Sequence, residues 1–482
     1  MGALRDHCGV IGIAGRESVA PLMYFGLKSL QHRGQESAGM TTVDDAGQSR
    51  TIKGMGLVDT VFTPEVVAEL KGATGIGHCR YSTAGRSVAE NAQPHTVNVA
   101  PGTVSLAHNG DIVNAPKILE ELKAKGYGFI TDNDTEVACR LLANKFVHYP
   151  DNPVKAIKEL MAEIVGAYSF TLILGRDLWA VRDPYGIRPL VVGKLADGAG
   201  YVVASESVAL DVLGAELIRD VAPGEIVHLT KDGIEFHKTT VPEQPAHCFF
   251  EYVYFARGDS IIDGELAQEA RRRIGMALAK EAPVDADIVV PVPDSGRAHA
   301  AGYAEASHIP LREGLMKNRY VHRTFIMPGQ DNRERNVRLK LNPIKPVLAG
   351  KRVIIVDDSI VRSTTMKRIV ELVRGAGAKE VHVRIASPPI TDPCYLGVDF
   401  HHRSQLVGAN HTVEEIRKLI GANSLAYTTT DGMVKAINLP RAKLCLGCVT
   451  GEYPVPIQGE RVRGQVVLEK FTPARAPAVA QN

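Results

Sequence analysis

The feature that most constrains this sequence is a short apolar run that leads directly into two acids and several hydroxyl residues, at Val353 to Thr365. The β-branched residues from Val353 to Val356 are too few for a helix and are typical of a strand buried on both faces. A helix is predicted next, because apolar residues recur at helical spacing from Met366 to Val373 and glycines then end the pattern. A second apolar run, Val381 to Ile385, completes a β-loop-α-β unit.

The polar loop of this unit lies where a strand ends and a helix begins, and unpaired N–H groups at such a helix end favour an anion. Hydroxyl residues in the loop suit a phosphate, and the two acids can accept hydrogen bonds from ribose hydroxyls or hold Mg²⁺. A solvated acidic turn with a helix cap is the simpler alternative. The whole string resembles the signature of phosphoribosyltransferases that use phosphoribosyl pyrophosphate. This resemblance implies a substrate site formed by Asp357, Asp358, Ser359, Arg362, Ser363, Thr364 and Thr365.

Length and charge limit the remaining possibilities. A chain of 482 residues exceeds what one hydrophobic core usually supports, so two or three domains are expected. Its 56 basic and 54 acidic residues nearly cancel, and no long run of either sign occurs, which argues against nucleic acid or a membrane as the main partner. No apolar stretch is long enough to span a bilayer and no secretion signal is present, so we expect a cytoplasmic protein.

The first half of the chain carries a cysteine followed by a glycine-rich apolar run, Cys8 to Gly15, which predicts a strand. Four polar motifs follow it, at residues 31–39, 77–83, 108–110 and 133–136. In this order they resemble the glutamine-hydrolysing domain of the amino-terminal-nucleophile amidotransferases. The resemblance implies an αββα sandwich over residues 8–240, with Cys8 as the nucleophile.

Nucleophilic hydrolysis of glutamine needs a thiolate, a base, an oxyanion hole and anchors for the amino acid. In this family the mature first-residue cysteine supplies thiolate and base together, because its α-amine has a pKa of roughly 8. The resemblance therefore implies that Met1 to His7 is a propeptide, with His7 at a position where relatives with a leader usually carry an acid.

The other family roles carry over by position. Arg80 would pair with the substrate carboxylate and Asp134 would bind its ammonium group, while Asn109 and Gly110 would form the oxyanion hole. The alternatives are a surface ion pair for Arg80 and a type I′ hairpin turn for the Asn109-Gly110 dipeptide. Two histidines of these motifs, His32 and His108, are interpreted as structural.

The second half follows a proline-containing linker, predicted at residues 241–247. Residues 288–297 read as another strand and turn, which in phosphoribosyltransferases holds pyrophosphate. By this resemblance Asp294, Ser295 and Lys317 join the substrate site, and Ser295, Asp357 and Asp358 bind Mg²⁺. The basic stretch from Lys317 to Lys340 is interpreted as a cover that excludes water, with a solvated basic loop as the alternative.

Cysteine positions suggest a metal centre. Cys445 and Cys448 form a C-x-x-C pair, and Cys248 and Cys394 could join them around one centre, whereas Cys79 and Cys139 read as small buried apolar residues. Spacing alone does not separate iron from zinc. The four positions coincide with the ligands of a [4Fe–4S] cluster in the propeptide-bearing branch of the amidophosphoribosyltransferases, so the resemblance implies iron.

Together the halves resemble the glutamine phosphoribosylpyrophosphate amidotransferase family. We expect the glutaminase sandwich to be followed by a type I phosphoribosyltransferase domain of the α/β class with a parallel sheet at 248–454, and by a disordered tail at 455–482. The resemblance also implies a homotetramer inhibited by purine nucleotides. A salvage-type phosphoribosyltransferase would leave the first half unexplained, and a phosphoribosyl-pyrophosphate-sensing DNA regulator disagrees with the balanced charge.

Overall fold

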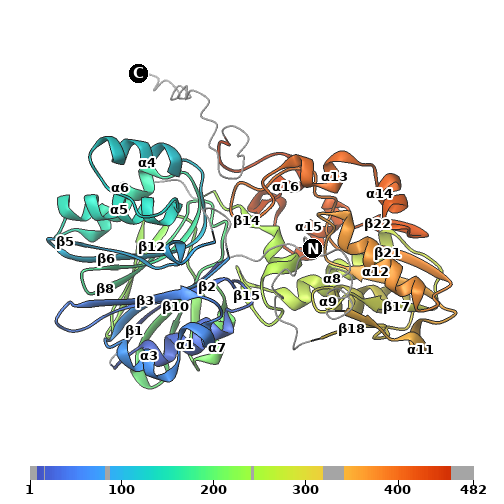
Figure 1. Ribbon diagram of the computed structural model, residues 1–482, viewed down its shortest axis with the longest axis horizontal. Coiled ribbons are helices and arrows are strands. Elements are labelled where there is room, and N and C mark those ends of the chain that lie inside the picture. The colour runs from blue at the N-terminus through green and yellow to red at the C-terminus, as the bar shows by residue number, and fades with distance from the viewer. Residues whose placement is uncertain (1–7, 16, 82–86, 240–243, 319–340, 458–482) are drawn as a thin grey trace.

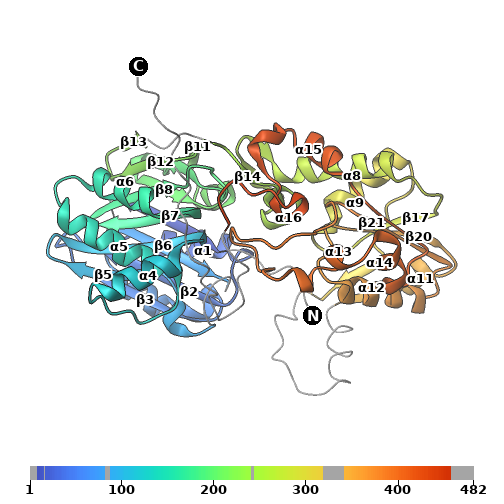
Figure 2. The ribbon, with the colours of Figure 1, turned by 90° about the horizontal axis from the view of Figure 1, so that it is seen from above.

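The computed structural model describes residues 8–15, 17–81, 87–239, 244–318 and 341–457. The chain forms two lobes that lie side by side (Figure 1), and the view from above shows the same division (Figure 2). We call residues 8–239 the amino lobe and residues 244–457 the carboxyl lobe. Within the described ranges, no helix combines the length and the apolar character needed to cross a membrane.

The amino lobe consists of two stacked antiparallel sheets with helices on both outer faces. In spatial order the first sheet contains β11 (Glu216–Asp220), β9 (Val191–Lys194), β10 (Gly200–Ala204), β1 (Gly9–Gly15), β4 (Thr74–Arg80), β2 (Ser37–Val43) and β3 (Ser49–Met55). The second contains β13 (Ile234–Lys238), β12 (Glu225–Leu229), β8 (Asp177–Arg182), β7 (Gly166–Leu174), β6 (Gly102–Ile112) and β5 (His95–Val99). The helices are α1 (Ala20–Ser29), α2 (Val58–Val61), α3 (Pro64–Glu69), α4 (Ala115–Ala124), α5 (Asp134–His148), α6 (Pro153–Glu163) and α7 (Ser207–Val212).

Side-chain alternation along β1 explains these layers. Ile11 and Ile13 pack with Met23 and Leu27 of α1, whereas Val10 on the opposite face packs in the core between the two sheets. Successive strand residues point to opposite faces, so a strand that is apolar throughout is buried on both sides. The predicted αββα sandwich is confirmed.

The carboxyl lobe is built on a four-stranded parallel sheet, in the order β17 (Ile288–Pro291), β20 (Arg352–Asp357), β21 (Glu380–Ile385) and β22 (Ser424–Tyr427). Val353 and Ile355 pack with Met366 and Ile369, and Ile354 and Val356 pack with Leu278 and Tyr303 on the other face. The main helices are α8 (Ala267–Glu281), α9 (Gly296–Ser307), α12 (Ser363–Gly375), α14 (Val413–Ile420) and α15 (Thr430–Ile437), with the short helices α11 (Lys345–Leu348), α13 (Val407–Asn410) and α16 (Gly447–Thr450). The predicted parallel α/β domain, with a central strand buried on both faces, is confirmed.

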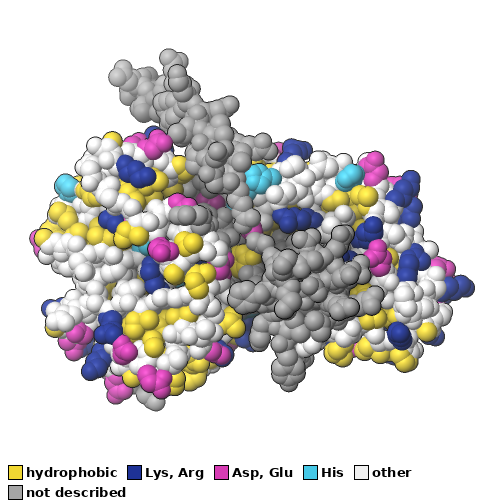
Figure 3. Space-filling view, in the orientation of Figure 1, with side chains coloured by type: hydrophobic (Ala, Val, Ile, Leu, Met, Phe, Trp, Pro, Cys, Tyr) yellow, Lys and Arg dark blue, Asp and Glu magenta, His cyan; other side chains and the backbone are white. Residues whose placement is uncertain are grey.

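Short strand pairs complete the carboxyl lobe. They are β15 (Ile261–Ile262) with β16 (Glu265–Leu266), β18 (Leu315–Lys317) with β19 (Leu341–Pro343), and β14 (His247–Cys248) with β23 (Leu444–Cys445). The parallel β14–β23 pair brings a segment near residue 445 back to the start of the lobe. On the face that Figure 3 shows, acidic and basic side chains occur on both lobes.

The predicted linker lies partly outside the described residues. Its described part runs along the amino lobe, where the N–H groups of Ala246 and Cys248 donate to the carbonyl oxygens of Tyr185 and Ile187 at 2.6 and 3.1 Å. The predicted propeptide (1–7) and the end of the predicted tail (458–482) also lie outside the described residues, as does most of the predicted basic cover (319–340).

Candidate functional site

Cys8 lies immediately before β1 and is buried, with 7 % of its surface exposed. Its thiol donates to the carbonyl oxygen of Tyr81 at 3.5 Å. Burial raises the pKa of this thiol, and the charge of Arg80 lowers it, while Asp134 and Glu36 raise it. Cys8 is the predicted nucleophile, and Arg80 and Asp134 are the predicted anchors for the two charged ends of glutamine. These three residues are therefore close enough for their charges to affect one another.

Arg80 and Asp134 approach Cys8 from different elements. The β1–β4 register pairs Gly9 with Cys79, which places Arg80 next to Cys8. Arg80 is 1 % exposed and pairs with Glu36 at 3.4 Å, so the surface ion pair considered for it is wrong. Asp134 begins α5, and its carboxylate accepts the Ile112 N–H at 3.1 Å.

Asn109 and Gly110 lie inside β6, so the hairpin turn considered for this dipeptide is wrong. Among the described residues, neither the amide nitrogen nor the amide oxygen of the fully buried Asn109 has a hydrogen-bond partner. Gly110 has a φ of 145°, and a Cβ there would come within 2.0 Å of the Ala167 carbonyl oxygen. Since an unpaired buried amide is costly, this arrangement fits a group that is completed by a bound ligand.

His32 and His108 both contact acids. His108 Nδ1 lies 3.5 Å from Asp134 Oδ2, and His32 Nε2 lies 2.8 Å from Glu206 Oε1. Glu36 belongs to the 31–39 motif but was not among the predicted site residues. Glu206 was not among them either, because a single acid before a short helix carries no pattern of its own.

A second group of polar residues lies at the carboxyl end of β20. Asp357 and Asp358 are 9 % and 5 % exposed, so the solvated acidic turn considered for them is wrong. Burial raises the pKa of both carboxyls, and the adjacent charge of Asp358 raises that of Asp357 further. Hydroxyl groups of Ser295 and Ser359 hydrogen-bond to Asp358 and lower its pKa.

This pair of acids fits a cation. Two neighbouring buried carboxylates repel each other when both are ionised, and a bound divalent ion removes that cost. The serine predicted to share the metal, Ser295, is in contact with Asp358. The donors are all oxygens, which is the chemistry that Mg²⁺ prefers.

The remaining predicted substrate residues lie around this end of the sheet. Helix α12 begins at Ser363, and the buried Thr365 hydroxyl has no partner among the described residues. Arg362 hydrogen-bonds to Gln405, and Lys317 pairs with Asp294 at 2.8 Å. Thr364 is exposed.

The four candidate cluster cysteines lie close together although they come from three segments. The β14–β23 register pairs Cys248 with Cys445. Burial raises the pKa of Cys448, and the nearby charges of Cys394, Cys248 and Cys445 raise it further. The described residues contain no set of three or more His, Cys, Asp or Glu placed to hold one metal ion. A [4Fe–4S] cluster differs from such a site because each cysteine binds a different iron.

Backbone N–H groups lie near these thiols. Cys394 Sγ accepts the Leu396 N–H at 3.4 Å. Burial raises the pKa of Cys248 and Cys445, and backbone hydrogen bonds partly offset that rise. The thiols of Cys79 and Cys139 donate to the carbonyl oxygens of Leu30 and His95. N–H groups directed at sulfur suit thiolates bound to a cluster, so the donor set fits iron–sulfur ligation.

Comparisons with known proteins identify the two lobes. A family model described as "Glutamine amidotransferase domain" matches residues 78–212, and one described as "Phosphoribosyl transferase domain" matches residues 263–387. The amidophosphoribosyltransferase of Methanothermobacter thermautotrophicus is 48 % identical over 461 residues, covering 95 % of this chain and 96 % of its own. That of Archaeoglobus fulgidus is 50 % identical over 458 residues, covering 94 % of this chain and 99 % of its own.

Solved structures agree over a similar length. The B. subtilis glutamine phosphoribosylpyrophosphate amidotransferase, in complex with ADP and GMP, has a TM-score of 0.88 at 43 % identity and covers 95 % of this chain and 99 % of its own. Another structure, described as the allosteric regulatory enzyme of purine biosynthesis, has a TM-score of 0.89 at 43 % identity, with 95 % and 98 % covered. With both lobes matched and identity near one half over almost the entire length, the chain belongs to the amidophosphoribosyltransferase family.

Proposed function

We propose that this chain converts glutamine, phosphoribosyl pyrophosphate and water into 5-phosphoribosylamine, glutamate and pyrophosphate, the first step of purine synthesis. Membership of the amidophosphoribosyltransferase family supports this activity. The observation that carries the residue assignments is the Asn109 amide, which is buried without a partner among the described residues in the lobe that holds Cys8, Arg80 and Asp134. We assign hydrolysis to residues 8–240 and transfer to residues 248–454.

In the hydrolysis step, Cys8 Sγ attacks the amide carbon of glutamine while its own α-amine accepts the thiol proton. Asn109 Nδ2 and the Gly110 N–H donate to the developing oxyanion. Arg80 binds the substrate carboxylate and Asp134 its ammonium group. The C–N bond breaks, ammonia leaves with the transferred proton, and water hydrolyses the thioester to glutamate and the free thiol.

In the transfer step, Asp357 and Asp358 accept hydrogen bonds from the ribose hydroxyls. Ser359, Arg362, Ser363, Thr364 and Thr365 bind the 5-phosphate, and Asp294, Ser295 and Lys317 contact the pyrophosphate. Ser295, Asp357 and Asp358 would hold Mg²⁺, which would supply charge stabilisation for the departing pyrophosphate. Ammonia then forms the new bond to the anomeric carbon as the bond to pyrophosphate breaks.

The experiment that tests this proposal measures glutamate and pyrophosphate together. Anaerobically purified protein is incubated with Mg²⁺ and glutamine, with and without phosphoribosyl pyrophosphate. We expect glutamate release to depend on the second substrate and to match pyrophosphate in a one-to-one ratio. Pyrophosphate without glutamate, formed only when ammonia is added, would contradict the role of Cys8, and neither product would contradict the proposal as a whole.

We also propose that Cys248, Cys394, Cys445 and Cys448 hold a [4Fe–4S] cluster, which would crosslink the chain near residue 445 to the start of the carboxyl lobe. Anaerobic protein is expected to contain about four iron and four acid-labile sulfide per chain. The variant Cys448→Ser is expected to lose most of the iron and to unfold at a lower temperature, because a crosslink between distant segments is lost. Iron and sulfide assays with thermal melts measure both effects.

The matched control for that variant is Cys139→Ser. Cys139 is also buried, but its thiol donates to carbonyl oxygens and is not a predicted cluster ligand. It should retain its iron. Zinc in place of iron, or iron retained by Cys448→Ser, would contradict the cluster assignment.

Regulation and assembly are part of the proposal. The B. subtilis relative, solved with ADP and GMP, supports purine nucleotides as inhibitors of this chain. The family resemblance supports a homotetramer.

A further inference from the structure

A buried arginine connects the nucleophile to the other lobe. Arg33 is 1 % exposed, and its Nε donates to the main-chain carbonyl oxygen of Cys8 at 3.1 Å. Its Nη1 and Nη2 groups donate to Glu251 of the carboxyl lobe at 3.0 and 2.8 Å. One guanidinium therefore binds both the main chain of Cys8 and a carboxylate that lies 218 positions further along the sequence.

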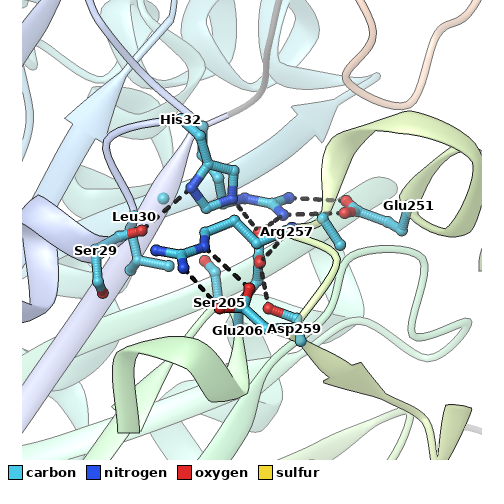
Figure 4. A network of polar contacts seen from close by, with 12 residues as sticks. Ser29, Leu30, His32, Ser205, Glu206, Glu251, Arg257 and Asp259 are labelled. Atoms are coloured by element: carbon cyan, nitrogen blue, oxygen red, sulfur yellow. Dashed lines mark hydrogen bonds and ion pairs between the residues drawn. The ribbon is translucent and has the colours of Figure 1, made fainter. Parts of the chain in front are cut away.

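A carboxylate from each lobe faces this guanidinium. Glu206 of the amino lobe contacts it through Nη1, and the Glu206 carboxylate also accepts the Ser260 hydroxyl and the Arg257 N–H of the carboxyl lobe at 2.6 and 3.0 Å. Figure 4 shows Glu206, Glu251 and His32 converging at this point. Glu206 and Glu251 are 0 % and 1 % exposed, so the charges depend on one another rather than on water.

Glu251 has a second cationic partner, Arg188, which also contacts the loop that packs on the predicted oxyanion hole. Arg188 is fully buried, and its Nη1 lies 3.3 Å from Glu251 Oε1 while its Nη2 donates to the Leu396 carbonyl oxygen at 2.8 Å. The next residue, Gly397, has a φ of 105°, and a Cβ there would lie 3.1 Å from the main-chain carbon of Gly110. The loop that follows Cys394 is thus packed directly on the backbone of Gly110.

The local backbone at Glu251 is also unusual. Glu251 begins a π-helical turn, Glu251–Phe255, three positions after Cys248. π-Helical turns are rare and occur frequently at functional sites. This turn directs a carboxylate of the carboxyl lobe into the amino lobe, where Arg33 and Arg188 bind it.

We propose that Glu251 is a positioning residue for glutamine hydrolysis, supplied by the lobe that carries out the transfer step. Glu251 fixes Arg33, which fixes the main chain of Cys8 and with it the α-amine that serves as base. Through Arg188, Glu251 also holds the 394–400 loop against Gly110. The inference rests on the proposed function and adds to it that the hydrolytic geometry is complete only when the carboxyl lobe is docked. Small displacements of reacting groups are costly, since about 1 Å can lower a rate about 10²-fold.

The test compares Glu251→Gln with the wild type in two assays. We expect kcat/KM for glutamine to fall about 10²-fold, with most of the loss in kcat, while the ammonia-dependent rate changes by less than about twofold. Labelling of Cys8 distinguishes a misplaced nucleophile from a generally disrupted fold. Alkylation of Cys8 by a diazoketone analogue of glutamine should slow by a similar factor, whereas its alkylation by iodoacetamide should not slow. If Glu251→Gln does not fold, Glu251→Asp replaces it in both assays, because aspartate keeps the charge on a shorter side chain.

The matched control is Asp259→Asn. Asp259 pairs with Arg257 a few residues from Glu251, but the pair is exposed, with side chains 54 % and 41 % accessible, and it does not contact Arg33. This variant should behave as the wild type in both assays and in labelling.

Two outcomes would overturn the inference. One is wild-type labelling by the glutamine analogue in the folded Glu251 variants, and the other is an equal loss of glutamine-dependent and ammonia-dependent activity, which indicates a purely structural role. A wild-type protein without either activity would instead contradict the proposed function. In that case the labelling rates still decide whether Glu251 positions Cys8.

Discussion

Replacing Cys8 with alanine is expected to lower glutamine-dependent synthesis of phosphoribosylamine by at least about 10⁴-fold, the scale seen when a catalytic nucleophile is removed. No other group can take over the attack, because the oxyanion hole and the substrate anchors act only on a bond that the sulfur has begun to form. The same variant should retain its ammonia-dependent activity, since the acids at the end of β20 lie in the other lobe. Glutamate and pyrophosphate, measured with each nitrogen source, check both expectations.

The mature amino terminus provides an independent test of the same site. If the α-amine of Cys8 is the base, active wild-type protein must begin at Cys8, with Met1 to His7 removed. Mass spectrometry of the intact chain measures this directly. Glutamine-dependent activity in a protein that still begins with Met1 or Gly2 would contradict the assignment, as would a Cys8→Ala variant that hydrolyses glutamine at the wild-type rate.

Replacing Asp357 with asparagine is expected to lower the transfer rate by about 10²-fold or more with either nitrogen source, because charge stabilisation at the pyrophosphate is lost. The same change should stabilise the metal-free protein at neutral pH. Burial and the neighbouring Asp358 raise the pKa of Asp357 well above its ordinary value, so ionisation of this group opposes folding. Asparagine has nearly the same shape and carries no charge. An increase in melting temperature of about 3 °C is expected without Mg²⁺.

The sign of the pH dependence follows from that shift. A carboxyl whose folded pKa is raised holds its proton in the fold while the unfolded chain loses it above a pH of about 4. The contribution of Asp357 to stability therefore decreases as the pH rises through this window, and the advantage of the asparagine variant should disappear as the pH falls to about 4. Adding Mg²⁺ should raise the melting temperature of the wild type more than that of the variant. Thermal melts across pH, with and without the metal, measure these differences.

Asp287→Asn is the matched control at the opposite end of the same sheet. Asp287 precedes β17, and its ion pair with Arg352 at 2.9 Å and hydrogen bond from the Arg352 N–H lower its pKa to about 2. The effect of this carboxylate on stability therefore has the opposite sign. The Asp287→Asn variant should be slightly less stable than the wild type at neutral pH, with unchanged activity. A wild type more stable than Asp357→Asn in metal-free buffer at neutral pH would contradict the account of the buried pair.

Much of the fold could be predicted because its determinants are local. The apolar runs at 9–15 and 353–356 are buried on both faces, and the helical pattern from Met366 to Val373 buries those positions in α12. The Asn109-Gly110 dipeptide is the exception, because its preference for a turn lost to pairing along β6, where Asn109 lies opposite Ser169 of β7. Tertiary pairing decided that conformation, which a dipeptide preference does not specify.

The sequence by itself determined which chemistry is present: the cysteine before a strand, the paired acids before a hydroxyl-rich loop, and the four thiols. The first two belong to motifs whose residues are near one another in sequence, as do Cys445 and Cys448, whereas the family resemblance joined Cys248 and Cys394 to that pair. Only the tertiary structure decided the neighbours of Arg33, which meets Glu251 across 218 positions, and the contact of Gly397 with Gly110. Such contacts leave no local pattern in the sequence. A buried charge must pair with whichever opposite charge lies next to it in space, and here the docking of the two lobes determines which residues are neighbours.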